Sequence, residues 1–129
     1  MIRGIVTPRR EAVIRIRISG PARSEELDAV IDSGFNDFLT LPLSLINSFA
    51  LPFAAPMLAT LADGSVVETT SYRATIIWDE HPREVFVIQC AGEPLVGMSM
   101  LYGYDLRVEA IDYGLVTIQK HSTTKESKP

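Results

Sequence analysis

The chain has 129 residues, of which 47% are hydrophobic and 22% are charged. This length and composition predict one globular domain with a buried core and exclude a disordered chain. The net charge of −4 argues against a nucleic-acid partner, and a single cysteine, Cys90, excludes an internal disulfide framework. Cys90 ends the apolar run from Val85, so we expect its thiol to be buried and inert.

The N-terminus reads Met1-Ile2-Arg3-Gly4 and leads to charge rather than to the apolar core of a signal peptide, so a cytoplasmic location is expected. From Phe38 to Ala62 no residue is charged, a stretch long enough for a membrane-spanning helix. Pro42, Pro52 and Pro56 interrupt it, and each proline removes a backbone donor. We therefore interpret the stretch as a strand end, a short helix and a loop, with no membrane partner.

The first predicted strand runs from Ala12 to Ser19, where isoleucines alternate with Arg15 and Arg17. Such alternation is typical of a strand with one face buried and the other in water. Gly20-Pro21 ends the strand, and we expect a polar loop over residues 23–26.

A second predicted strand, Leu27 to Asp32, leads directly into the triplet Asp32-Ser33-Gly34. A short apolar run that ends at a glycine turn indicates a strand and its exit, so a buried strand carries the Asp32 carboxylate to a tight turn. Asp, Ser and Gly are also ordinary turn residues, and the triplet alone does not separate a catalytic site from a simple turn.

Pro42 to Phe49 is a predicted helix, because proline is favoured at the start of a helix. Asp63-Gly64 predicts the tip of a hairpin whose arms are Met57–Ala62 and Ser65–Trp78. Asp-Gly between two strand-like runs is the strongest short-range hairpin signal. We expect Trp78, at the end of the second arm, to be a structural residue, in the core or on the strand surface.

The next predicted elements are a turn over 79–83, a strand over 84–90 and a short helix over 98–102 that Gly103 closes. After them, apolar and charged residues alternate over 106–110, a turn follows over 112–114, and the last strand covers 115–119. Residues 121–129 are polar, and we expect a mobile tail there, which leaves residues 1–120 as the one domain. The two histidines, His81 and His121, are far apart in the sequence, so we expect no metal site and no other cofactor.

Many short strands separated by turns, with at most two short helices, predict an all-β, barrel-like domain. Asp32-Ser33-Gly34, the hairpin at Asp63-Gly64 and the late Leu95-Val96-Gly97 occur in an order that resembles the retropepsin-like, or retroviral-type, aspartic proteases. The resemblance covers residues 1–119. It is closest to the small bacterial members, through Ile31 to Phe35 and Leu39-Thr40-Leu41-Pro42.

This resemblance implies an acid-protease barrel with one lobe per chain and one catalytic aspartate, Asp32, in each lobe. Two identical chains would meet about a two-fold axis, and the two Asp32 carboxylates would share a proton and activate a water. Ser33 would bond main chain across the axis, and Gly34 would let substrate backbone approach closely. The implied activity is hydrolysis of extended peptides or unfolded protein by a homodimer.

By the same resemblance, Asp63-Gly64 would be the tip of a flap that closes over the substrate. Phe35 is bulky where the viral enzymes have a small residue, and Asn36 follows it, so these two residues are candidates for a substrate subsite. Met98 stands where an arginine often follows the late glycine, so the viral arginine-to-aspartate brace has no obvious counterpart.

Two other functions stay open at this point. The same dimeric fold could bind extended peptides without cutting them, which is favoured if Phe35 fills the cleft or the flap cannot open. Alternatively, the uncharged surface of Phe38–Ala62 could dock a partner in a structural interaction protein.

Overall fold

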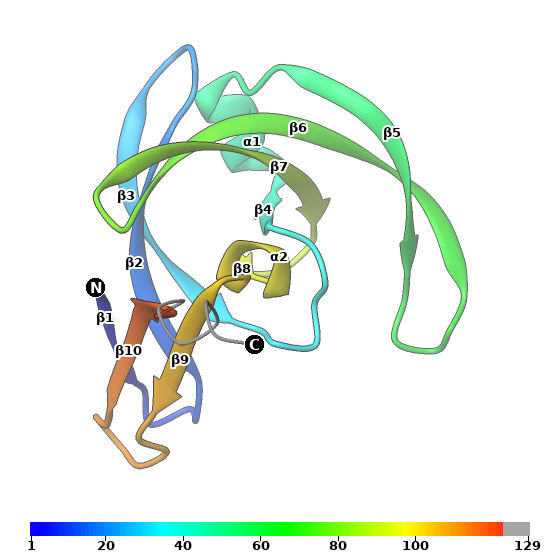
Figure 1. The fold of residues 1–129 in the computed structure, drawn as a ribbon. Helices are drawn as coiled ribbons and strands as arrows, with labels where there is room; N and C mark the ends of the chain where they lie inside the picture. Colours follow the sequence, from blue (N-terminus) through cyan, green and yellow to red (C-terminus); the bar gives the residue numbers. More distant parts are fainter. Residues whose placement is uncertain (123–129) are drawn as a thin grey trace, which may run out of the picture.

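Ten β-strands and two short helices make up the computed structural model of the chain, which describes residues 1–122 (Figure 1). The all-β prediction is confirmed. In chain order the elements are β1 (Ile2–Val6), β2 (Ala12–Ser19), β3 (Ser24–Ile31), β4 (Leu39–Pro42), α1 (Leu43–Phe49), β5 (Phe53–Thr60), β6 (Val66–Trp78), β7 (His81–Cys90), β8 (Leu95–Val96), α2 (Met98–Leu101), β9 (Tyr104–Val108) and β10 (Leu115–Lys120).

All the described strands belong to one sheet, in the order β5-β6-β7-β4-β8-β3-β2-β1-β10-β9. The end of β6 also pairs with β2, where Arg17–Ser19 lies opposite Thr75–Ile77, so the sheet curls over on itself. Within residues 1–122 the outer strands β5 and β9 each pair on one side only. The described strands therefore form one sheet that curls over on itself without being a closed barrel, where the sequence predicted a barrel-like domain.

The core lies inside the curl, where the alternating strands place their apolar side chains. On β2, Ile14, Ile16 and Ile18 are buried, while the arginines between them are exposed, as predicted. Burial of one such side chain contributes about 1.5–3 kcal/mol. Trp78 is 2% exposed and stacks edge-on against Tyr104, so of the two positions that the sequence left open, core or strand surface, it occupies the core.

The long uncharged stretch forms β4, α1 and β5. The predicted helix is confirmed: Pro42 caps α1, and Phe49 packs into the core with no exposed surface. The loop expected after it is shorter than predicted, because β5 already begins at Phe53. Pro56 is tolerated within β5 because this outer strand has a free edge. Among residues 1–122, no helix has both the length and the apolar character needed to cross a membrane.

Several details differ from the sequence predictions. β3 begins at Ser24, because its exposed charged residues pair along β2 instead of forming a loop. β7 begins at His81, because Asp79 and Glu80 alone make the turn, both with positive φ. Cys90, expected to be buried, is partly exposed at the end of β7.

The predicted tail is only partly described. His121 contacts the Asp105 carboxylate on β9 over 2.7 Å, so the chain is still attached to the sheet there. Residues 123–129, where we expect a mobile tail, lie outside the described residues.

Candidate active site

Asp32 follows the last residue of β3 and begins a tight turn. The N–H of Phe35 donates to the Asp32 carbonyl over 3.1 Å and closes the turn. The N–H of Gly34 donates to Asp32 Oδ1 over 3.0 Å, so the carboxylate is held by its own turn. The Asp32 residue is half-buried, and Ser33 and Gly34 are exposed. The predicted placement of a carboxylate at a strand exit is confirmed.

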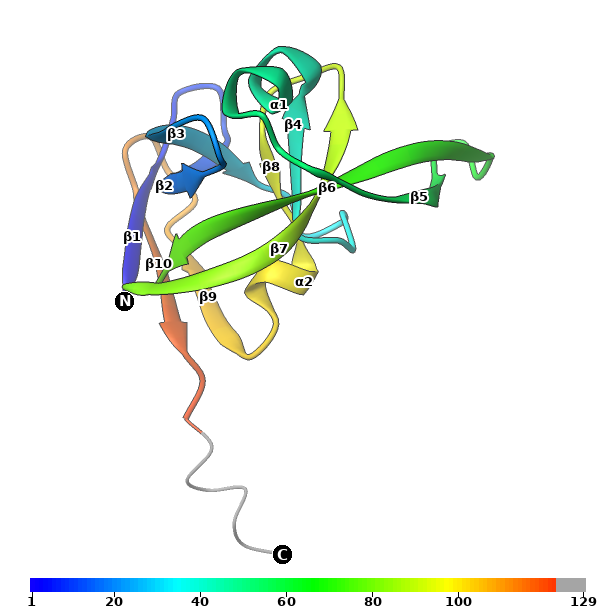
Figure 2. The same ribbon diagram turned by 90° about the horizontal axis from the view of Figure 1, so that it is seen from above.

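The two-residue strand β8 lies between β3 and β4 (Figure 2). It runs parallel to β3, with Ile31 opposite Val96, and antiparallel to β4, with Leu39 opposite Val96. The Asp32 N–H donates to the Val96 carbonyl over 2.9 Å. The structure thus brings together the two distant stretches that carry the family resemblance.

Gly97 fits against the loop that follows the triplet, and only a residue without a side chain fits there. A Cβ at this position would lie 2.6 Å from the Phe35 carbonyl oxygen, and closer still to that of Asp37. The next residue, Met98, donates its N–H to the Phe35 carbonyl over 2.7 Å. One side of the loop is therefore covered by Gly97 and the start of α2.

The proposed subsite residues Phe35 and Asn36 take part in this packing. The Phe35 ring lies beside Gly97, and the Asn36 carbonyl accepts the Ser99 hydroxyl over 2.5 Å. Asn36 also lines a surface pocket of about 400 Å³ together with Met98. Both residues support the loop, a role that the sequence did not indicate.

Arg83 on β7 is a second support that sequence reasoning missed. Its guanidinium donates to the carbonyl oxygens of Met100 and Ser99 over 3.0 and 3.3 Å, and it lies 5.3 Å from the centre of the Phe38 ring. Arg83 thereby ties β7 to α2 and to the residue just before β4. No spacing in the sequence indicated this, because its hydrogen bonds to oxygen are made to main-chain carbonyls.

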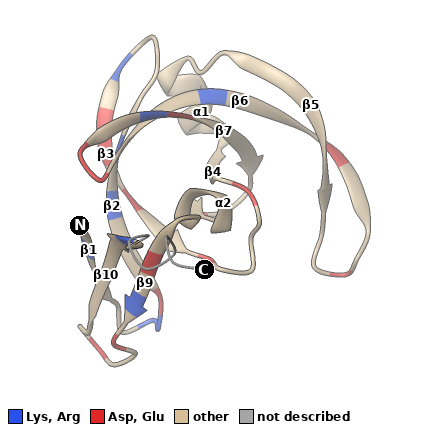
Figure 3. Cartoon of the chain, in the orientation of Figure 1, with Lys and Arg blue, Asp and Glu red and all other residues tan. Residues whose placement is uncertain are grey.

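The predicted hairpin at Asp63-Gly64 is confirmed. Gly64 has φ of 87°, a conformation that favours glycine. The Asp63 carboxylate accepts hydrogen bonds from the Ser65 hydroxyl and N–H, at 2.6 and 2.9 Å, and these bonds lower the pKa of Asp63. The hairpin is long, and its only charges before Thr69 are acidic (Figure 3).

The structure does not bring the hairpin tip to Asp32. In both views the tip stands apart from the cyan loop of residues 32–38 (Figures 1 and 2). The base of the hairpin is close to that loop, however. Asp37 and Phe38 line one pocket of about 220 Å³ together with Pro56 and Met57 of β5 and Phe86 of β7.

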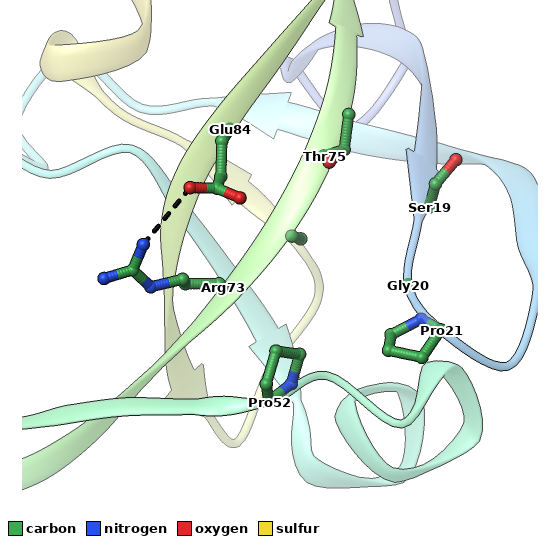
Figure 4. A pocket seen from close by; sticks show the side chains of 8 residues that line it. Ser19, Gly20, Pro21, Pro52, Arg73, Thr75 and Glu84 are labelled. Carbon is green, nitrogen blue, oxygen red and sulfur yellow. Dashed lines mark hydrogen bonds and ion pairs between the residues drawn. The ribbon is translucent and has the colours of Figure 1, made fainter.

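Of two further pockets, one borders the Asp32-Ser33-Gly34 triplet and the other does not. Ser33 lies on a pocket of about 440 Å³ between the β1–β2 connection and the β9–β10 connection. Another, of about 340 Å³, contains the ion pair of Arg73 and Glu84 and none of the predicted site residues (Figure 4). Within residues 1–122 there is no group of three or more His, Cys, Asp or Glu that could hold a metal ion.

No protein-family model matches the chain, and no curated protein sequence matches it.

Proposed function

We propose that the chain is a retropepsin-like aspartic endopeptidase that acts as a homodimer, with Asp32 of each copy forming the catalytic dyad. The hydrogen bond from the Asp32 N–H to the Val96 carbonyl is the observation that carries this proposal. It joins the turn that presents the carboxylate to the strand before Gly97. The two motifs of the resemblance thus support one another physically, although they are far apart in the sequence.

The chemistry follows from pairing the two carboxylates. Two carboxylates in contact do not both ionise readily, so one keeps a proton while the other stays charged, as is well established for aspartic protease dyads. The charged Asp32 takes a proton from water, which attacks the peptide carbonyl. The protonated Asp32 stabilises the developing oxyanion and then gives its proton to the leaving amine. The two pKa values belong to the pair.

The substrate class that fits this site is an extended peptide. The outer edge of β5 is free among the described strands and can pair with a peptide backbone, as in β-strand addition. The pocket beside Phe38, Met57 and Phe86 offers an apolar place for one side chain. Closure of the hairpin toward Asp32 would complete the enclosure of the peptide.

The test is cleavage of an unfolded protein from acidic to neutral pH by the wild type and by Asp32→Asn. Asn keeps the size of the side chain and an Oδ1 that can accept the Gly34 N–H, so the turn should persist. We expect the rate to fall by about 10³-fold or more, since the members of a catalytic unit are not additive. Asp28→Asn is the matched control, because this exposed carboxylate on β3 pairs only with Arg15 at the surface.

Equal cleavage by the wild type and Asp32→Asn would overturn the proposal. Binding of the unfolded protein by both, with cleavage by neither, would indicate instead the peptide-binding module considered from the sequence.

A further inference from the structure

We propose that the second copy of this chain docks on the pocket that opens beside Ser33, here called the Ser33 pocket. It has a volume of about 440 Å³ and is lined by Arg10, Ile31, Ser33, Val108, Ile111 and Asp112, among others. The inference rests on the proposed function, because a single chain contributes only one Asp32 and its site is incomplete alone.

The position of Asp32 limits where the partner can sit. If two Asp32 carboxylates touch, the two-fold axis passes between them, and the surface next to each must face the other copy. One side of the loop of residues 32–38, which carries the Asp32-Ser33-Gly34 triplet, is already covered, because Gly97 and Met98 pack against Phe35. Ser33 is exposed and lies on a pocket that neither Gly97 nor Met98 lines. The Ser33 pocket is therefore the surface that a partner would cover.

This surface carries apolar side chains that the single chain leaves in water. Ile111, which lines the pocket, is 67% exposed, and Tyr113, in the same turn but outside the pocket lining, is 69% exposed. Val108, on the same pocket, is 39% exposed and lies at the end of β9, whose outer edge is unpaired within residues 1–122. Large exposed apolar residues grouped beside an incomplete site are typical of an interaction surface.

The turn that presents Ile111 is fixed in position before any partner binds. The Gly114 N–H donates to the Ile111 carbonyl over 2.9 Å, and the Tyr113 N–H donates to the Val6 carbonyl over 2.8 Å. Glu109 closes the turn by accepting the Leu115 N–H on its carboxylate over 3.0 Å, which lowers the pKa of Glu109. Because the turn is already ordered, little conformational freedom is lost when it is buried.

The charges on the Ser33 pocket suit a second copy of the same chain. Arg10 and Asp112 both line it, and neither is in an ion pair within the part of the chain that the structure describes. In a two-fold interface the same surface of both copies is buried, so each contact between two different residues occurs twice, once from each copy. Arg10 of each copy can therefore face Asp112 of the other.

The first test replaces Ile111 by glutamate and measures dimer dissociation by light scattering and native mass spectrometry. Tyr102→Glu is the matched control, since Tyr102 is 83% exposed on the α2 side, away from this pocket. We expect Ile111→Glu to raise the dimer dissociation constant by about tenfold or more, through desolvation of the new charge. Tyr102→Glu should leave it unchanged. A wild-type dissociation constant in Ile111→Glu would overturn the proposal.

The second test uses Arg10→Asp and Asp112→Arg. Each variant alone places like charges opposite one another and should dissociate. An equimolar mixture of the two variants can form a heterodimer in which both contacts join opposite charges. One contact joins the two substituted positions, and the other joins the native Asp112 of the first variant to the native Arg10 of the second. Association should therefore return, and recovery of association by mixing also shows that both variants are folded. Failure of the mixture to associate more tightly than either variant would also overturn the proposal.

Association is measured without reference to catalysis, so the two proposals can fail separately. A dimer that follows these rules but cuts no peptide would overturn the protease function and keep the interface. If the wild type cleaves peptide as a dimer, and Ile111→Glu, Arg10→Asp and Asp112→Arg all dimerise as tightly as the wild type, the proposed interface is overturned and the proposed function stands.

Discussion

The N–H of Asp32 donates a hydrogen bond of 2.9 Å to the carbonyl oxygen of Val96. Through this bond, the turn that presents the carboxylate and the strand that ends at Gly97 form one unit. The position of Asp32 therefore depends on residues far along the chain, and changes in those residues should be detectable at Asp32.

Gly97→Ala should displace the triplet loop. The new Cβ would meet main-chain oxygens of Phe35 and Asp37, which cannot move without shifting the loop. We expect a loss of about 1–3 kcal/mol in the free energy of unfolding, measured with urea, together with reduced cleavage. Gly92→Ala is the control, because a Cβ there meets nothing within 4 Å, and its cost should stay within about 0.5 kcal/mol. Equal stability of the two variants would contradict the packing described for Gly97.

Gly64→Val should impair turnover more than folding. Gly64 and Gly103 have φ of 87° and 88°, and a Cβ at either position would have no neighbour within 4 Å, so valine strains both backbones alike. We expect each variant to lose about 1–3 kcal/mol of stability. Only Gly64→Val should lower kcat/KM beyond what its stability explains, because only Gly64 lies at the tip of the hairpin. Parallel losses of activity in both variants would mean that the hairpin is not a flap.

Arg83→Met should loosen the loop that carries the triplet. It removes two charge-assisted hydrogen bonds to carbonyl oxygens of α2, each worth about 1.5–3 kcal/mol. Faster hydrogen exchange over residues 32–38 is the expected readout. Arg73→Met is the control, because Arg73 also stacks on a phenylalanine, but its ion pair with Glu84 is exposed and worth about 1 kcal/mol or less. The same exchange rates in both variants would show that Arg83 does not support the loop.

The hydrogen-bonded turn at the hairpin tip should persist at acidic pH, because the Asp63 carboxylate that accepts its hydrogen bonds stays ionised there. Hydrogen bonds from Ser65 lower the pKa of Asp63. The bond from the Ser65 hydroxyl has the larger effect, and the bond from the Ser65 N–H has the smaller one. The stabilisation from these bonds is therefore fully present above the ordinary value of 3.8 and is lost as the pH falls through the lowered pKa. The Ser65 amide signal in an NMR titration should have a midpoint below 3.8, and Ser65→Ala should raise the midpoint for Asp63. A wild-type midpoint at or above that value would contradict the hydrogen bonding at the tip.

Local patterns in the sequence predicted the elements that depend on local physics. Alternation of Ile14, Ile16 and Ile18 with arginines predicted β2, Pro42 predicted the start of α1, and Asp63-Gly64 predicted the hairpin. The turn at Asp32 was also predictable, because an apolar run ended in turn residues.

The elements that were missed depend on contacts between distant residues. β8 has two residues, too few for any periodicity, and is a strand because β3 and β4 lie on either side of it. Arg83 was assigned to a turn, since its partners are carbonyl oxygens of a helix that follows much later. The Ser33 pocket needs the β9–β10 connection to fold back beside β1 and β3, which no local pattern predicts.

The central claim is that Asp32 acts in a dyad shared between two copies. It is tested most directly by adding increasing Asp32→Asn chain to a fixed concentration of wild type, with subunit exchange verified by mass-tagged chains. Each mixed dimer has one ionisable Asp32 and should be inactive, so cleavage should fall as wild-type homodimers are replaced by mixed ones. If mixed dimers form and cleave as fast as the wild type, Asp32 does not act in a shared dyad.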